Sequence, residues 1–424
     1  MSGSQTRMNA TAGERRYTKL SQAQVDVICH KHERFFQCKP GGGRAVFAWC
    51  DLSGLSFRGR VLQDADFTAA ILADCDLVGC NFDKSNLFCA DLQMANLMGA
   101  SLRRVDLRGA CLRGANLSGV DLYEADLREG ALALPDKHAG LAYVEISMRT
   151  SEATYANLRG ANLERSKLSG IQAMKADFSD ATMKGCKLVR ANLKQAIMNN
   201  VDLAGADLSG ADFTGASMKD AVLIGAKTDM MRTEQADMSG VLTDKIVGTD
   251  VKTLPYGEML QDHAKWVDTL GKQGKPSTFD KADLRALGQI RGLNLTALSA
   301  RGAVFYGLDM RGVQLQGAHL EGADLRNCNL KGADLRGVRM YQARLDGANL
   351  EGANLGALQI DATRVLPADL REARMRGANL ADADLKLAKL DGADLSRANL
   401  EGASMKLEAL EHVTCVGLRG RLAS

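Results

Sequence analysis

Residues 90–129 read ADLQMANLMGASLRRVDLRGACLRGANLSGVDLYEADLRE, and in this stretch leucine recurs at every fifth position. The series begins at Leu52 and continues without a break to Leu132, with phenylalanine in place of leucine at a few of its seventeen positions. A mostly small residue, such as Ala95, stands two places before each of these side chains, and Asp or Asn commonly stands between the two. The repeating unit is therefore A-[D/N]-L-x-x.

Two further runs carry the same unit. The phase slips by one residue after position 132, and a second run covers 158–238. A third run covers 290–410, with Ala300 and Val365 as irregular sites. The side chains that we expect to form the core include Leu52, Leu72, Leu92, Leu112, Leu132, Leu193, Leu208, Phe213, Leu315, Leu335, Leu350 and Leu400.

A period of five residues fits neither the turn of an α-helix nor the two-residue alternation of a simple strand. The chain must instead turn every five residues. If the small residue and the leucine both point inward, and the chain turns through a right angle at the remaining positions, four repeats close one square coil. Glycine at the last position, as in Gly109 and Gly332, relieves the steric limits at such a turn. The coils then stack, and each coil depends on its neighbour to bury its leucine residues.

These features resemble the pentapeptide-repeat family, and the resemblance covers most of the chain. It implies an all-β fold, a right-handed quadrilateral β-helix, for which the motif is highly specific. The best understood members of the family protect or inhibit DNA gyrase by imitating duplex DNA. The resemblance therefore adds DNA mimicry to the functions that the chain must be tested for.

Two segments outside the repeats predict short amphipathic helices, at residues 20–36 and 254–271. Each places four residues at offsets of three and four, which is one face of a helix. The four residues are Val25, Ile28, His32 and Phe35 in the first segment and Tyr256, Met259, His263 and Trp266 in the second. An uncovered terminal coil would expose apolar core and unpaired backbone groups, so we expect these helices to cap two solenoid blocks. The matching patterns indicate an internal duplication of cap and solenoid.

The same reasoning divides the chain into segments. We predict a disordered tail at 1–17, a capping helix with a first solenoid at 18–245, a linker with a second capping helix at 246–281, a second solenoid at 282–415 and a C-terminal tail at 416–424. An excursion at 133–152 interrupts the first solenoid. Because long irregular segments on rigid scaffolds are common places for function, we take it as the candidate partner loop. Its candidate contact residues are Lys137, His138, Tyr143, Glu145 and Arg149.

The sequence predicts no catalytic, cofactor-binding or metal-binding residues. It lacks a nucleophile elbow, a metalloprotease motif and a dinucleotide fingerprint. Cys29, His30, His32 and Cys38 form a cluster, but their spacing departs from zinc patterns such as a CxxC pair. Asp and Asn are numerous because they recur before the repeat leucine, where they can bond to turn backbone on a solvated face.

Composition and charge limit the possible partners. The net charge is +3, which gives no argument for direct nucleic-acid binding. No apolar run is long enough to span a membrane, and the N-terminus lacks the apolar stretch of a secretory signal. Ten cysteines without such a signal point to reduced thiols in a cytoplasm.

The distribution of charge separates the functional hypotheses. Residues 45–132 include 12 acidic and 8 basic residues, residues 153–240 include 10 and 11, and residues 282–411 include 17 of each. A mimic of duplex DNA, which carries about one charge per 1.7 Å of axis, should show one sustained sign. Only the first stretch leans that way. The leading prediction is therefore a non-enzymatic scaffold that binds an unknown protein partner by its long faces, by the excursion at 133–152, or by both. The alternatives are a DNA-mimic modulator of gyrase or topoisomerase and a secreted effector, and the oligomeric state stays open.

Overall fold

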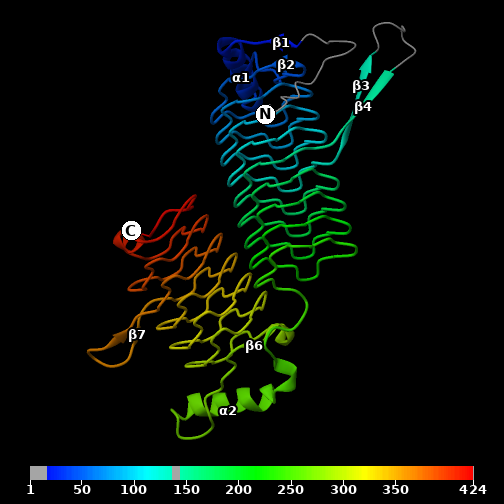
Figure 1. The fold of residues 1–424 in the computed structure, drawn as a ribbon. Helices are drawn as coiled ribbons and strands as arrows, with labels where there is room; N and C mark the ends of the chain where they lie inside the picture. Colours follow the sequence, from blue (N-terminus) through cyan, green and yellow to red (C-terminus); the bar gives the residue numbers. More distant parts are fainter. Residues whose placement is uncertain (1–16, 136–143, 424) are drawn as a thin grey trace, which may run out of the picture. The chain divides into compact units, whose positions relative to one another are not determined.

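The computed structural model describes residues 17–135 and 144–423, and their side chains apart from those of 132–135 and 144–147. The chain divides into two compact units, Met1–Asp244 and Lys245–Ser424, here called unit 1 and unit 2. The predicted disordered tail lies outside the described residues except for Tyr17. Each unit is a stack of square coils (Figure 1).

Successive coils pair in parallel through single bridges that recur every twenty residues. Val46 pairs with Asp66, which pairs in turn with Asn86. The bonds are short, as between the Leu92 N–H and the carbonyl of Cys111 at 2.7 Å. A five-residue repeat therefore makes one side of the coil, and the fold is a quadrilateral β-helix.

The core of each unit consists of the repeat leucines and the small residues that precede them. Eleven of the twelve expected core side chains are at most 1% exposed. These are Leu52, Leu72, Leu92, Leu112, Leu193, Leu208, Phe213, Leu315, Leu335, Leu350 and Leu400. The prediction that Leu132 belongs to the coil core is wrong. Its backbone pairs with Ser147 in a hairpin and not with a neighbouring coil.

Two features of the repeat explain its residue preferences. The last residue of the unit has positive φ, 69° at Gly109 and 57° at Asp64, which favours glycine. The Asp or Asn before the leucine accepts a hydrogen bond from the N–H two residues later, as in the 3.0 Å bond from Thr68 to Asp66. These Asp and Asn side chains therefore hold the turn.

The excursion in unit 1 is an antiparallel hairpin of β3 (Gly130–Pro135) and β4 (Val144–Arg149). Cys111 pairs with Glu152, 41 positions later, and the next three bridges around the coil have the same spacing. The other single bridges of this unit join residues 20 positions apart. The hairpin thus adds 21 residues without removing a coil, and this shifts the repeat phase by one. Its base is regular β-structure.

A second hairpin was not expected. It consists of β7 (Leu358–Gln359) and β8 (Val365–Leu366) in unit 2. Arg339 pairs with Asp369, 30 positions later, so ten residues are inserted here. Val365, counted as an irregular repeat position, is 46% exposed in this hairpin.

Both units begin with a strand, a helix and a second strand. In unit 1, β1 (Thr18–Lys19) pairs in parallel with β2 (Cys50–Asp51), and α1 (Gln22–Phe36) lies between them in sequence. In unit 2, β5 (Thr249–Asp250) pairs with β6 (Ala282–Asp283), with the 3-10 helix η2 (Val251–Thr253) and α2 (Tyr256–Asp268) between them. The segment 246–281 is therefore not a free linker, because Thr249 pairs with Ala282 and Val251 is fully buried.

Unit 2 departs from the regular coil at two 3-10 helices, η3 (Arg285–Leu287) and η4 (Leu407–Leu410). After η4 the stacking resumes, and Arg419 pairs with Asn399. The predicted C-terminal tail at 416–424 is thus part of a coil at least as far as Arg419, because its backbone has a partner in the preceding coil.

Candidate protein-binding surface

The hairpin β3–β4 leaves unit 1 at one corner of the coil and is fixed there at its base. The chain returns at Ser151, whose hydroxyl donates to the carbonyl of Arg128 (2.7 Å) and accepts from the N–H of Gly109 (2.9 Å). A Cβ atom at Gly130 would lie 2.9 Å from the Arg108 carbonyl oxygen, so glycine is needed for this close approach. The attachment is therefore rigid, and Figure 1 shows the two strands projecting from the stack.

An apolar cluster occupies the same corner in the preceding coils. Ala69 and Cys89 are buried there against the partly buried rings of Trp49 and Phe88. The Arg108 guanidinium lies over the Phe88 ring, 5.3 Å from its centroid. Burial raises the pKa of the Cys89 thiol, which leaves it neutral at ordinary pH. This corner is a structural support for the hairpin.

The structure places only part of the predicted partner loop. Lys137, His138 and Tyr143 lie outside the described residues. Glu145 is on β4 with its backbone paired to Leu134. Arg149 is the last residue of β4. It lies close to Gly109, where an added Cβ atom would be 3.3 Å from the Arg149 Cβ atom.

Met148 is a large apolar side chain of this hairpin that is open to a partner. It is 62% exposed and precedes Arg149 on β4. The sequence analysis did not single it out. The signal was the alternation of Val144, Ile146 and Met148 with polar residues, which is typical of a strand with one apolar face.

Helix α1 is attached to the first coils of unit 1 by polar contacts. The Gln22 amide donates to the Ser56 carbonyl (2.8 Å) and accepts from the Ser56 N–H (2.9 Å). Arg60 forms ion pairs with Asp26 (3.0 Å) and Glu33 (3.2 Å). Both acidic residues of α1 are thus neutralised by one arginine of the solenoid.

The inward face of α1 differs from the predicted one by a small rotation. Val25 and His32 are fully buried and Ile28 is partly buried, but Phe35 is 48% exposed. Cys29, which the prediction omitted, is fully buried in its place. Phe35 packs instead edge-on against Phe36, with ring centroids 5.7 Å apart.

In α2, His263 is fully buried, and Met259 and Trp266 are partly buried. Tyr256 is 39% exposed. It is the first residue of the helix, before the part of the helix that packs on the solenoid. The assignment of Tyr256 to that face is therefore corrected.

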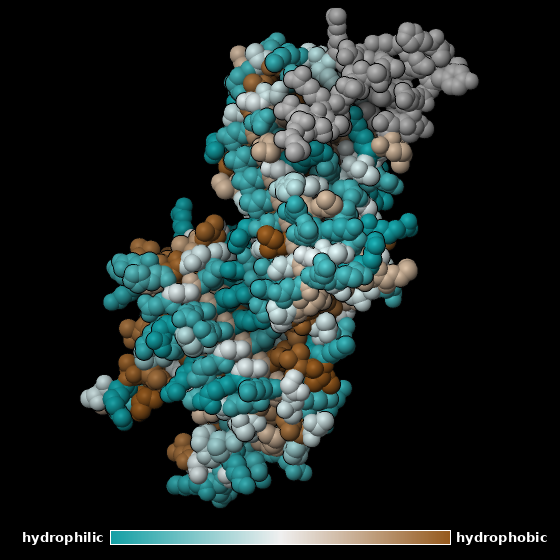
Figure 2. All heavy atoms as spheres, viewed as in Figure 1, coloured by the Kyte–Doolittle hydropathy of each residue, from teal (hydrophilic) through white to brown (hydrophobic). Residues whose placement is uncertain are grey.

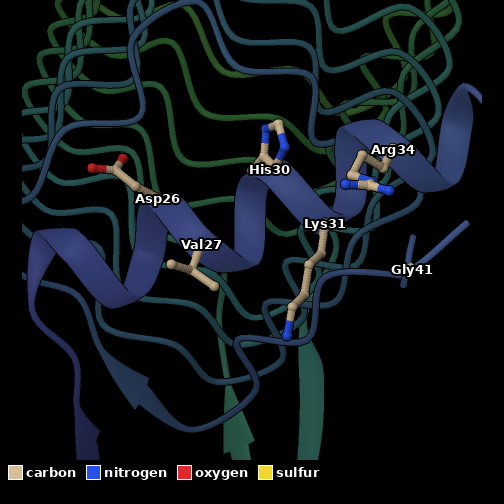
Figure 3. Close-up of a pocket in the computed structure, with 6 residues that line it drawn as sticks. All are labelled: Asp26, Val27, His30, Lys31, Arg34 and Gly41. Atoms are coloured by element: carbon tan, nitrogen blue, oxygen red, sulfur yellow. The ribbon is translucent and has the colours of Figure 1, made fainter. Parts of the chain in front are cut away.

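A shallow hollow lies on the outer side of α1. It is lined by Asp26, Val27, His30, Lys31, Arg34 and Gly41 (Figure 3). Its basic side chains stand in the second half of the helix, where positive charge complements the helix dipole. Asp26 is already paired with Arg60. The hollow therefore has a structural explanation and needs no ligand.

The cysteine and histidine cluster of α1 is divided by burial. Cys38 is exposed, whereas Cys29 is buried and burial raises its pKa to about 12. Within residues 17–135 and 144–423, no group of three His, Cys, Asp or Glu side chains could hold a metal ion. In the same ranges, no helix is long and apolar enough to cross a membrane.

At several positions on the solenoid faces, an aspartate pairs with an arginine of its own repeat. Arg128 donates to the two carboxylate oxygens of Asp126 through Nε (2.9 Å) and Nη2 (2.7 Å). The same Asp-x-Arg pair occurs at Asp106–Arg108, Asp309–Arg311, Asp334–Arg336 and Asp369–Arg371. In the view of Figure 2, hydrophobic residues form separate groups among hydrophilic ones. At these five positions the carboxylate is bound to a guanidinium and does not stand free.

The fold and these surfaces define a β-helical repeat protein with a projecting hairpin. The pattern described as pentapeptide repeats matches the chain at 43–77, 65–104, 100–132, 156–195, 196–227, 289–327, 318–356 and 368–406. These stretches cover more than half of its length, and the chain belongs to the pentapeptide-repeat family. The fold of this family is the right-handed quadrilateral β-helix.

The chain also matches solved structures, two of which are described as pentapeptide repeat proteins. HetL, a pentapeptide repeat protein involved in heterocyst differentiation regulation from the cyanobacterium Nostoc sp. strain PCC 7120, is 23% identical, covers 74% of this chain and 87% of its own, and has a TM-score of 0.18. QnrB1, a plasmid-mediated fluoroquinolone resistance protein, is 19% identical over 54% of this chain and 98% of its own, with a TM-score of 0.19. Rfr23 from the cyanobacterium Cyanothece 51142 is 26% identical over 32% and 88%, with a TM-score of 0.16. No curated protein sequence matches the chain.

Proposed function

We propose that this protein is a non-enzymatic scaffold that binds a partner protein through the hairpin β3–β4. Two solenoids, each closed at its amino end by a helix, supply the rigid support. The observation that carries the proposal is the way the hairpin is attached. It adds 21 residues and leaves the bridges between coils intact on both sides, so the solenoid does not need it as a structural element.

The backbone of the hairpin supports this assignment. Among the described residues, β3 and β4 pair only with each other in a two-stranded sheet, so each strand has an outer edge with no described strand beside it. Such edges are templates for pairing with another chain, and an isolated hairpin has little stability of its own. A bound partner strand would pair with the free edge and would stabilise the hairpin. Exposed Met148 adds apolar contact area next to Arg149.

The polar groups of the solenoid argue against an enzyme. A general acid or base needs a carboxylate that is free to exchange a proton. In the described repeats, the Asp before the leucine typically holds its turn, and several also bind an arginine, as Asp126 does. Paired hydrogen bonds of this kind favour the charged form and remove the group from proton transfer.

DNA mimicry is the second candidate. Residues 45–132 have an excess of four acidic residues, which favours it. Asp106 is bound to Arg108 and Asp126 to Arg128, so these two carboxylates are not free to imitate phosphates. A gyrase supercoiling assay with the purified protein tests this candidate, and protection or inhibition at stoichiometric protein would replace the scaffold proposal.

The scaffold proposal is tested by capture of a partner with two matched deletions. Deleting 130–150 removes the first hairpin, and deleting 358–367 removes the second, which leaves Ala357 to close the turn of its coil. We expect a partner to be retained by the full chain and by the second deletion but lost with the first. Retention by all three proteins would contradict the proposal.

A photo-crosslinking residue placed at Met148 gives an independent readout. We expect it to capture the same partner as the pull-down. The matched control is the same residue at Met230, which is 84% exposed and lies in the last coil of unit 1. Equal capture from both sites would show that the partner does not recognise the hairpin.

A further inference from the structure

The two buried histidines of α1 and α2 have the same role in the two units. His32 and His263 are both 0% exposed. The Nδ1 atom of His32 accepts from the N–H of Ala45 (3.0 Å), and that of His263 accepts from the N–H of Ser277 (2.9 Å). In each case the donor is at the beginning of the first coil, since the carbonyls of Ala45 and Ser277 accept hydrogen bonds from the next coil. The imidazole therefore joins the helix to the start of the solenoid.

The hydrogen bonds define the protonation state of His32. Nδ1 faces an N–H donor, so it must carry a lone pair. Nε2 lies 2.9 Å from the carbonyl of Gln63, so it carries the single ring proton. Protonation would place a second N–H on Nδ1, directed at the N–H of Ala45, and would put an imidazolium where no water reaches it. The attachment therefore exists only with neutral imidazole.

His263 is held by the same donor bond with a less complete second contact. Its Nε2 is buried without a hydrogen bond, although it faces the main chain of Thr296. The neighbouring Trp266 ring is 5.8 Å away between centroids. Protonation of Nδ1 would again oppose a backbone donor, here the N–H of Ser277.

The charges around each ring do not compensate an imidazolium. Around His32 these are Glu33 on α1, Arg44 in the segment before the first coil, and Asp64 on the first coil. Glu33 is already bound to Arg60, and Arg44 has the same sign as an imidazolium. Asp64 favours the charged ring, but its effect is smaller than that of burial. In the part of the chain that the structure describes, no charged side chain shifts the pKa of His263. Burial is the main cause that lowers the pKa of both histidines.

We infer that His32 and His263 are acid-released latches, which attach α1 and α2 to their solenoids at neutral pH and let them open when the rings are protonated. Opening of α1 would uncover the core face formed with Val25 and Cys29 and would free the backbone donor of Ala45. The amino edge of a solenoid is a strand edge. It would thus become accessible to another chain in acid but not at neutral pH.

The expected size follows from proton linkage. A released histidine titrates near pH 6.5, while the buried ring stays neutral to lower pH. The stabilisation is therefore fully present above about pH 6.5 and is lost as the pH falls below it. Between pH 7.5 and pH 5.5 the opening equilibrium of each helix should rise by up to about tenfold.

Hydrogen exchange of the α1 and α2 amides in the full chain measures this opening. After correction for the intrinsic effect of pH on exchange, we expect α1 to open up to about tenfold more at pH 5.5 than at pH 7.5. In His32→Gln, whose side chain does not titrate, α1 should open equally at both pH values while α2 still responds. His30→Gln is the matched control, because His30 is exposed on the same helix, and it should behave like the wild type.

Two results would overturn the inference. One is pH-independent opening of α1 in the wild type, and the other is an unchanged pH response in His32→Gln. Should His32→Gln fail to fold, titration of the His32 ring signals by NMR in the wild type decides the question. A pKa of His32 at or above 6.5 would then contradict the latch.

Discussion

Deletion of the first hairpin measures how far it is independent of the solenoid. Removing 130–150 would bring Cys111 and Glu152 to 20 positions apart, which is the spacing of the preceding pair Asp91–Cys111 and the following pair Glu152–Gln172. The joined sequence runs from Leu127 through Glu129 directly to Ser151. Ser151 is already buried in the small-residue position, so every side chain keeps its place in the repeat.

The expected cost arises at Glu129. In the deleted chain it becomes the last residue of its repeat and must adopt positive φ, as Glu124 does at 57°. This conformation costs a residue other than glycine about 1–2 kcal/mol. We expect the deletion to lower the free energy of unfolding of unit 1 by that amount, and Glu129→Gly in the deleted chain to recover part of it.

Fluorescence gives a reporter for unit 1 alone. The chain has two tryptophans, Trp49 and Trp266, so in a Trp266→Phe background Trp49 reports on unit 1 during urea unfolding. A loss larger than about 4 kcal/mol would exceed the cost of one strained residue and would refute the reasoning. A further loss on adding Glu129→Gly would refute it as well.

Two further predictions concern the core. Leu208→Ala removes a fully buried side chain and should lower the free energy of unfolding by about 2–5 kcal/mol, whereas Ile197→Ala, at a site that is 41% exposed, should lower it by less than about 1 kcal/mol. Urea unfolding measures both values, and similar losses would contradict the inward orientation of Leu208. In the native protein at pH 8, iodoacetamide should label exposed Cys38 but not Cys186, because burial raises the pKa of Cys186 to about 12. Peptide mapping by mass spectrometry measures the labelling of each cysteine, and equal labelling would contradict the burial of Cys186.

The five-residue period predicts the coils and their core because each side of the square uses one repeat. It also reveals the first hairpin, since an insertion of 21 residues shifts the phase by one. The second hairpin adds ten residues and leaves the phase unchanged, so Val365 falls on a repeat position by coincidence. The available signal was at Leu358 and Thr363, two residues before Ile360 and Val365, where Ala usually stands.

The helices show a different limit. Offsets of three and four identify the apolar side of α1 but not its centre. Cys29 and His32 are buried where the helix contacts the coil, and this rotates Phe35 outward. Which part of an amphipathic side touches the coil depends on long-range contacts, such as those of Gln22 with Ser56. Those contacts have no local pattern in the sequence.

The twenty-residue step between coils has a genetic consequence. Recombination between the similar segments of such a gene would gain or lose whole blocks of codons. A block of twenty codons adds or removes one coil, and the remaining coils keep their hydrogen-bond register. The length of this protein is thus free to vary in discrete increments during evolution, whereas an indel of one codon must be accommodated as a protrusion.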